Sequence, residues 1–134
     1  MERFAEQLAK ERRLKIVEIS LRATNAEKGH IMRYDAGVED FLSLVKNAEC
    51  VVTNSFHGAI FATQFKTPFY CFIREQGDTK IGEMLGLLGL KNRIMIDGSE
   101  SVPDDLNFDE VHDRIAKART SSEEYLEYAL GLLV

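Results

Sequence analysis

Residues 50–73, CVVTNSFHGAIFATQFKTPFYCFI, contain the pattern that decides the fold. Residues 50–53 form a short apolar run that ends at a polar turn, and residues 57–65 then carry apolar side chains at helical spacing. Pro68 stops that helix because it cannot continue the hydrogen-bond ladder, and a second apolar run, 69–73, follows it. Two apolar strands joined by a helix predict a βαβ unit, and hence a parallel sheet with helices against its faces.

The rest of the chain repeats this alternation of helix and strand. Gly89 predicts a left-handed end to the helix before it, and Ser121 with Glu124 has the spacing of a capping box that would start a last helix. The pattern therefore predicts an α/β fold, with a parallel sheet of about four strands, helices on both faces and a helical C-terminus. Helices are predicted at residues 2–13, 37–48, 57–65, 81–88, 108–118 and from 121, strands at 14–19, 50–53, 69–73 and 93–96, and a long polar loop at 22–35.

Length and composition limit the class of protein. The chain has 134 residues, 45% of them hydrophobic, and a formal net charge of −5, which is typical of one soluble domain. No block of lysine and arginine marks a nucleic-acid surface, and no apolar run approaches the roughly 20 residues that span a bilayer. The two cysteines, Cys50 and Cys71, are too few for a disulfide framework, so we expect small core residues in a reducing cytoplasm.

Polar residues directly after an apolar strand are the first place to look for chemistry, because ligands of parallel sheets bind beyond the carboxyl ends of the strands. The richest such stretch is residues 53–58, and weaker ones begin at Arg74 and at Ser20. In the first, a histidine and a glycine fall where a helix begins, and free amides and the helix dipole suit a phosphate or carboxylate there. The candidate site residues are Thr53, Asn54, Ser55, His57, Gly58 and Arg74.

Each candidate also has a simpler structural explanation. From spacing alone, His57 is more often a surface or capping residue than a catalytic one. Thr53, Asn54 and Ser55 are more often helix-capping and turn residues than ligand contacts. Arg74 beside Glu75 is more often half of a solvated ion pair than a phosphate ligand. His30 and His112 are predicted at the surface, and with no Cys/His cluster at ligand spacing we expect no metal site.

The residues that favour the functional alternative also resemble a known family. The stretches EDFL (39–42), NAECVVTNSFHGAIFA (47–62) and KTPF (66–69) are similar to the polysaccharide pyruvyl transferases, and weaker similarity extends over about residues 9–130. The resemblance implies a Rossmann-like half of a GT-B-like fold, with the site in a cleft between two domains. It also implies transfer of a pyruvyl group from phosphoenolpyruvate to a sugar of a bacterial cell-surface polysaccharide, without a further cofactor. His57 matches the catalytic histidine.

This chain departs from the family pattern in two ways. Asn54 stands where many members have aspartate, which leaves that position without a charge. Family members also have an N-terminal domain, and an apolar strand usually precedes the helix predicted here at 2–13. We therefore expect residues 1–134 to be a single C-terminal domain, without transferase activity alone, that needs a missing domain or a second chain. An exposed sheet edge would favour self-association.

Two alternative functions remain open on the sequence. The chain could be the nucleotide-sugar-binding half of a glycosyltransferase, because the same architecture supports that chemistry. It could also be a non-catalytic interaction module that lost its partner domain. Stabilisation by phosphoenolpyruvate or by a nucleotide-sugar would separate the first alternative from pyruvyl transfer.

Overall fold

The computed structural model describes residues 1–20, 23–73, 79–100 and 106–131, and in these ranges helices alternate with parallel strands. The predicted α/β class and the helical C-terminus are therefore confirmed. The helices are α1 (Glu2–Arg12), α2 (Val38–Asn47), α3 (Phe56–Gln64), α4 (Thr79–Leu87) and α5 (Phe108–Ala129), with short 3-10 helices η1 (Ala23–Lys28) and η2 (Lys91–Arg93). The strands are β1 (Val17–Ile19), β2 (Ile31–Arg33), β3 (Val51–Thr53), β4 (Phe69–Phe72) and β5 (Ile94–Met95).

A three-stranded parallel sheet, in the order β3-β4-β5, holds the core. Its middle strand β4 is buried along its whole length, because helices cover both of its faces. Phe69 and Cys71 pack against one layer of helices, and Tyr70 and Phe72 pack against α1 on the other face. The first layer contributes Val45 of α2, Ala59 and Ala62 of α3, Ile81 and Leu85 of α4, and Val111 of α5.

The first two strands form a separate sheet, which corrects the expectation of one sheet of about four strands. β1 pairs in parallel with β2, with Val17 opposite Ile31, and neither strand is hydrogen-bonded to the three-stranded sheet. The strand β2 lies inside the stretch 22–35 that the sequence predicts as a loop. It has only three residues and polar neighbours, so no alternation marks it, and its position depends on its pairing with β1.

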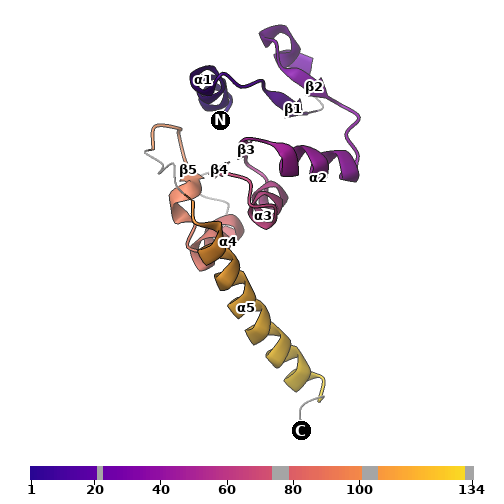
Figure 1. Ribbon diagram of the computed structural model, residues 1–134, viewed down its shortest axis with the longest axis vertical. Helices are drawn as coiled ribbons and strands as arrows, with labels where there is room; N and C mark the ends of the chain where they lie inside the picture. The colour runs from indigo at the N-terminus through magenta and orange to yellow at the C-terminus, as the bar shows by residue number, and fades with distance from the viewer. Residues whose placement is uncertain (21–22, 74–78, 101–105, 132–134) are drawn as a thin grey trace.

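Helix α1 packs on the three-stranded sheet and also contacts the segment before β2; Figure 1 shows it beside both. The Phe4 ring lies edge-on against Tyr70 and Phe72, with centroids 5.0 and 5.5 Å away. Two residues further on, the Glu6 carboxylate accepts a hydrogen bond from the Lys28 ammonium at 2.9 Å, which ties α1 to the segment before β2. The helix ends at Arg13, whose φ of 54° is left-handed, so the chain turns into β1.

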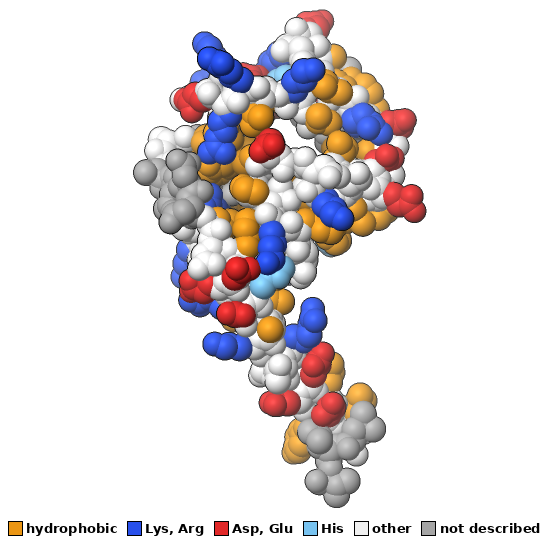
Figure 2. All heavy atoms as spheres, viewed as in Figure 1, with side chains coloured by type: hydrophobic (Ala, Val, Ile, Leu, Met, Phe, Trp, Pro, Cys, Tyr) orange, Lys and Arg blue, Asp and Glu red, His pale blue; other side chains and the backbone are white. Residues whose placement is uncertain are grey.

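The C-terminal segment is one continuous helix, so the predicted division into two helices near Ser121 is wrong. Asn107 caps α5 by accepting a hydrogen bond from the Glu110 amide at 3.2 Å. Further along, the hydroxyls of Thr120 and Ser122 donate to carbonyls four residues earlier, so these residues stay helical without acting as a cap. The second half of α5 is exposed and projects from the body of the molecule (Figures 1 and 2).

None of the helices within the described ranges is both long enough and apolar enough to cross a bilayer.

Candidate functional site

The predicted site residues come together where β3 ends and α3 begins. The Thr53 hydroxyl oxygen accepts a hydrogen bond from the Ser55 amide at 3.0 Å. The Ser55 hydroxyl oxygen in turn accepts from the Gly58 amide at 3.3 Å and caps α3. These two hydroxyls fix the turn, so the structural explanation of Thr53 and Ser55 holds for their contacts within the chain.

Gly58 allows α3 to start directly against the end of β3. It is buried, and a β-carbon built on it would lie 2.5 Å from the Thr53 hydroxyl oxygen and 3.2 Å from the Thr53 β-carbon. A side chain at this position would push the helix away from the strand. The glycine therefore keeps the first turn of α3 close to the strand end.

Asn54, Ser55 and His57 are the exposed residues of this turn. Phe56, between Ser55 and His57, is partly buried and packs on the core of the three-stranded sheet. The His57 ring stands edge-on to the Phe56 ring, with centroids 5.8 Å apart. An imidazole on the first turn of a nine-residue helix is where an anionic ligand would meet both the helix dipole and a proton donor.

Arg74 lies outside the described residues, so the structure does not relate it to the turn. The strand that precedes it, β4, runs beside β3, with Thr53 opposite Cys71. The carboxyl ends of these two strands therefore lie at the same edge of the sheet. Of the third predicted stretch, Ser20 is described and partly exposed, and Leu21 and Arg22 fall outside the described ranges.

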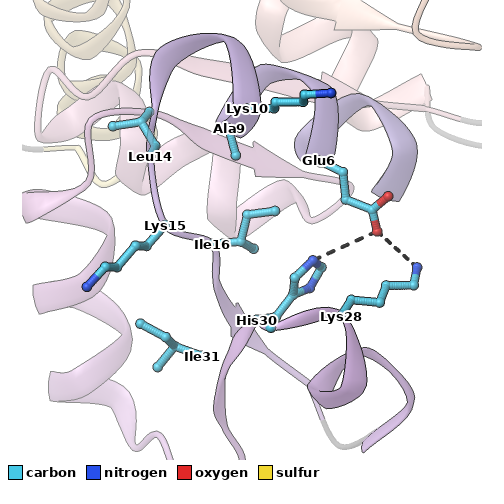
Figure 3. A pocket seen from close by; sticks show the side chains of 10 residues that line it. Glu6, Ala9, Lys10, Leu14, Lys15, Ile16, Lys28, His30 and Ile31 are labelled. Carbon is cyan, nitrogen blue, oxygen red and sulfur yellow. Dashed lines mark hydrogen bonds and ion pairs between the residues drawn. The ribbon is translucent and has the colours of Figure 1, made fainter.

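A polar cluster of Glu6, Glu18, Asn25 and His30 lies beside β1 and β2, and it was not predicted from the sequence. The prediction that His30 lies at the surface is wrong. The His30 side chain is only 7% exposed, with Nδ1 3.0 Å from a Glu18 oxygen and Nε2 3.8 Å from a Glu6 oxygen. The Asn25 amide also donates to Glu18, at 2.9 Å. Figure 3 shows Glu6 pointing toward both His30 and Lys28 at the rim of an open pocket.

This cluster has a structural role, because its contacts hold β1, the segment before β2 and α1 together. Burial opposes ionisation of Glu18, but hydrogen bonds from His30 and Asn25 outweigh it and hold the Glu18 pKa below its ordinary value. His30 comes just before β2, at the amino end of the strand and so at the opposite edge of the sheet from ligand sites of parallel sheets. His112 is likewise partly buried, with Nε2 3.0 Å from the Thr63 carbonyl oxygen.

Neither cysteine has the setting of a nucleophile. Burial raises the Cys50 pKa to about 11, and Cys71 is fully buried in the core. Over the ranges that the structure describes, no group of three or more His, Cys, Asp or Glu side chains is arranged to hold a metal ion.

Comparison with known proteins gives one match. No curated protein and no solved structure matches the chain. The family model for polysaccharide pyruvyl transferase matches residues 1–76, which include α1, both strands of the first sheet and the whole turn from Thr53 to Gly58. Since this match covers more than half of the 134 residues, the chain belongs to the polysaccharide pyruvyl transferase family.

Proposed function

We propose that this chain contributes the β3–α3 turn to a reaction that transfers a pyruvyl group from phosphoenolpyruvate to a sugar of a cell-surface polysaccharide. The observation that carries the proposal is the exposed His57 on the first turn of α3, beside the capped turn of Thr53, Ser55 and Gly58. Membership of the family supplies the reaction class.

The reaction needs a proton donor for the leaving phosphate. Two sugar hydroxyls add to C2 of the enolpyruvyl group, the CH2 carbon takes up one of their protons to become a methyl group, and the C2–O bond to phosphate breaks. The second hydroxyl proton is balanced by a proton on the released phosphate. His57 is assigned the donation of that proton to the leaving phosphate oxygen, because it stands where the helix dipole favours an anion.

The other turn residues have supporting roles in this proposal. Thr53 and Gly58 hold α3 against the strand end, and Ser55 keeps the first turn of the helix in place. Asn54 is exposed and uncharged, so its side-chain amide donates a hydrogen bond to phosphoenolpyruvate. It does not act as a general base. Arg74, after β4, is proposed as a second phosphate contact from the same edge of the sheet.

The turn is one wall of a cleft in this proposal. The family's GT-B-like arrangement would place a second domain opposite it, in the same chain or in another one, and the reaction would take place in the cytoplasm. We therefore expect residues 1–134 alone to bind phosphoenolpyruvate without transferring its pyruvyl group. Sustained release of phosphate by the isolated chain in the presence of a sugar acceptor would contradict that expectation.

The histidine ring signals in a ¹H–¹³C NMR spectrum test the site directly. The chain has three histidines, and His30 and His112 are held by Glu18 and by the Thr63 carbonyl. Phosphoenolpyruvate should shift the His57 ring signal and leave the other two in place. Equal shifts of all three, or a response to UDP-glucose in place of phosphoenolpyruvate, would contradict the proposal.

A pair of variants on α3 separates binding by His57 from effects on folding. His57→Ala should weaken phosphoenolpyruvate binding by about tenfold or more, which is the usual effect of losing a hydrogen bond to a charged group. Gln64→Ala removes another exposed side chain from the same helix and should leave the affinity within about twofold. If both variants bind as the parent chain does, His57 does not contact the donor.

A further inference from the structure

Three consecutive backbone amides converge on one anion directly after β5. The amides of Ile96, Asp97 and Gly98 all donate to the carboxylate of Glu100. Oε1 accepts from Ile96 at 2.5 Å and from Asp97 at 3.2 Å, and Oε2 accepts from Gly98 at 2.9 Å. Successive amides that point to one centre form a concave site for an anion. We call these three amides the β5 amide site.

The surrounding fold holds the β5 amide site in shape. Gly98 has a φ of 92°, a left-handed value that lets the chain bend so that its amide points to the same carboxylate as the other two. A β-carbon on Gly98 would lie 3.4 Å from the Phe4 β-carbon and 3.6 Å from the Phe72 ring, so the loop rests on α1 and β4. The Asp97 carboxylate accepts from the Ser99 amide at 2.8 Å and from the Ser99 hydroxyl at 2.6 Å, which closes the turn between them.

Glu100 is an occupant that a ligand can replace. It is only partly covered, and its own flexible side chain is what carries the carboxylate into the site. Among the described residues, no cationic side chain forms an ion pair with Glu100. Hydrogen bonds from the amides, that of Ile96 first, lower the pKa of Glu100 against the opposing effect of burial. The β5 amide site therefore stabilises a negative charge without a neighbouring cation.

The β5 amide site lies at the same edge of the sheet as the β3–α3 turn. β3, β4 and β5 are parallel neighbours (Figure 1), so their carboxyl ends share the edge where parallel sheets bind ligands. The Ile73 amide donates to the Met95 carbonyl at 3.0 Å, which puts the start of the site level with the end of β4. Only β4 separates β5 from β3, a distance of about 10 Å between the two strands.

That distance decides which molecule the β5 amide site could bind. Phosphoenolpyruvate carries its phosphate and its carboxylate on the same carbon atom, so it is too short to reach both the β3–α3 turn and the β5 amide site. With the donor phosphate at His57, the anion of the β5 amide site belongs to another molecule, and the acceptor is the other reactant.

We propose that the β5 amide site binds the carboxylate of an acidic sugar in the acceptor, and that Glu100 fills the site until the acceptor binds. That the acceptor is a sugar rests on the proposed function. Two amides on one oxygen and one amide on the other suit a carboxylate, as Glu100 demonstrates. Without a cation beside it, the site suits this single charge better than the double charge of a phosphate. A neutral sugar has no group that displaces Glu100, so the site would select acidic acceptors.

Titration of the 134-residue chain with glucuronate, followed by ¹H–¹⁵N NMR, tests this proposal. In Glu100→Ala, glucuronate should shift the amide signals of Ile96, Asp97 and Gly98. It should also bind about tenfold or more tightly than to the parent chain, because a tethered carboxylate no longer competes at its high local concentration. Glucose, which has the same ring without the carboxylate, should shift none of these signals. Glu83→Ala removes an exposed carboxylate from α4 and is the control for net charge, so it should bind glucuronate as the parent chain does.

A second variant covers the case in which Glu100→Ala disturbs the loop. Glu100→Gln keeps a side-chain oxygen that can accept from the amides but has no charge, so it should bind glucuronate more tightly than the parent chain and less tightly than Glu100→Ala. Unchanged affinity in both variants would overturn the proposal, and so would tighter binding of inorganic phosphate than of glucuronate. The response of the His57 ring to phosphoenolpyruvate is read in a separate titration, so failure of the donor site and failure of the β5 amide site are distinguishable.

Discussion

The contact between Thr53 and Gly58 determines how closely α3 approaches the end of β3. We expect Gly58→Ala to lower the free energy of unfolding by about 1–3 kcal/mol, the usual cost of overpacking a filled site. The reason is that the new β-carbon would lie 2.5 Å from the Thr53 hydroxyl oxygen, which already accepts the Ser55 amide. Urea unfolding followed by circular dichroism measures the change.

A second glycine is the matched control for this prediction. Gly82 lies in α4, and a β-carbon there would meet nothing within 4 Å, so Gly82→Ala should raise stability by up to about 1 kcal/mol. Adding Thr53→Ala to Gly58→Ala removes the nearest oxygen and should recover part of the loss. If Gly58→Ala is as stable as the parent chain, the close approach of helix and strand does not need glycine.

Cys50 should react slowly with alkylating agents at neutral pH. Burial raises its pKa to about 11, so at pH 8 its thiolate fraction is on the order of 100-fold below that of an ordinary cysteine. Mass spectrometry of iodoacetamide labelling should show a rate that still rises in proportion to hydroxide between pH 8 and 10. The urea-unfolded chain is the control, and a rate for the folded chain that levels off near pH 9 would contradict the prediction.

At the scale of elements, the sequence predicts those helices and strands whose own residues show a clear apolar spacing. The helices at 2–12, 38–47 and 56–64 follow from their apolar spacing, and Gly89, with φ of 74°, follows α4 as expected. Strand β2 could not be predicted, because three residues show no alternation and their pairing with β1 is a contact across η1. The continuity of α5 was missed because Ser121 also satisfies the pattern of a helix start.

The projecting half of α5 should open independently of the rest of the molecule. Val111 and Ile115 anchor the first half on the core, whereas the residues from 119 onward are exposed. Lys117→Gly should therefore cost about 1 kcal/mol of global stability, while Glu127→Gly should cost close to none, because that end of the helix can fray alone. Equal losses in the two variants would mean that the projecting half is held by contacts of its own.

At the scale of the whole molecule, the sequence could group the candidate residues but could not describe their contacts. A polar turn after a buried strand is visible in the sequence, and five of the six predicted residues do lie in one turn. The hydroxyl oxygens of Thr53 and Ser55 accept hydrogen bonds from backbone amides. These bonds depend on the local geometry of the turn, which the spacing of residues in the sequence does not reveal. The burial of His30 depends on Glu6 and Glu18, which are 24 and 12 residues away in the chain.

The contacts of Glu6 with Lys28 and of Glu18 with His30 make the stability of the folded chain depend on pH in the acid range. Hydrogen bonds from His30 and Asn25, against the opposing effect of burial, lower the Glu18 pKa, and a hydrogen bond from Lys28 lowers that of Glu6. The folded chain thus binds fewer protons at these groups than the unfolded chain does. Their stabilising effect is complete above the ordinary value of 4.5 and is lost as the pH falls through the lowered values.

The melting temperature should therefore be nearly constant from pH 6 to pH 5 and should fall below about pH 4.5. Glu18→Gln should lower the melting temperature at pH 6 and flatten its fall in acid, because the variant has no proton to gain at this position. Glu83→Gln, at an exposed position on α4, is the control and should keep the acid slope of the parent chain. If Glu18→Gln keeps that slope as well, the contacts of Glu18 with His30 and Asn25 do not limit the stability of the chain in acid.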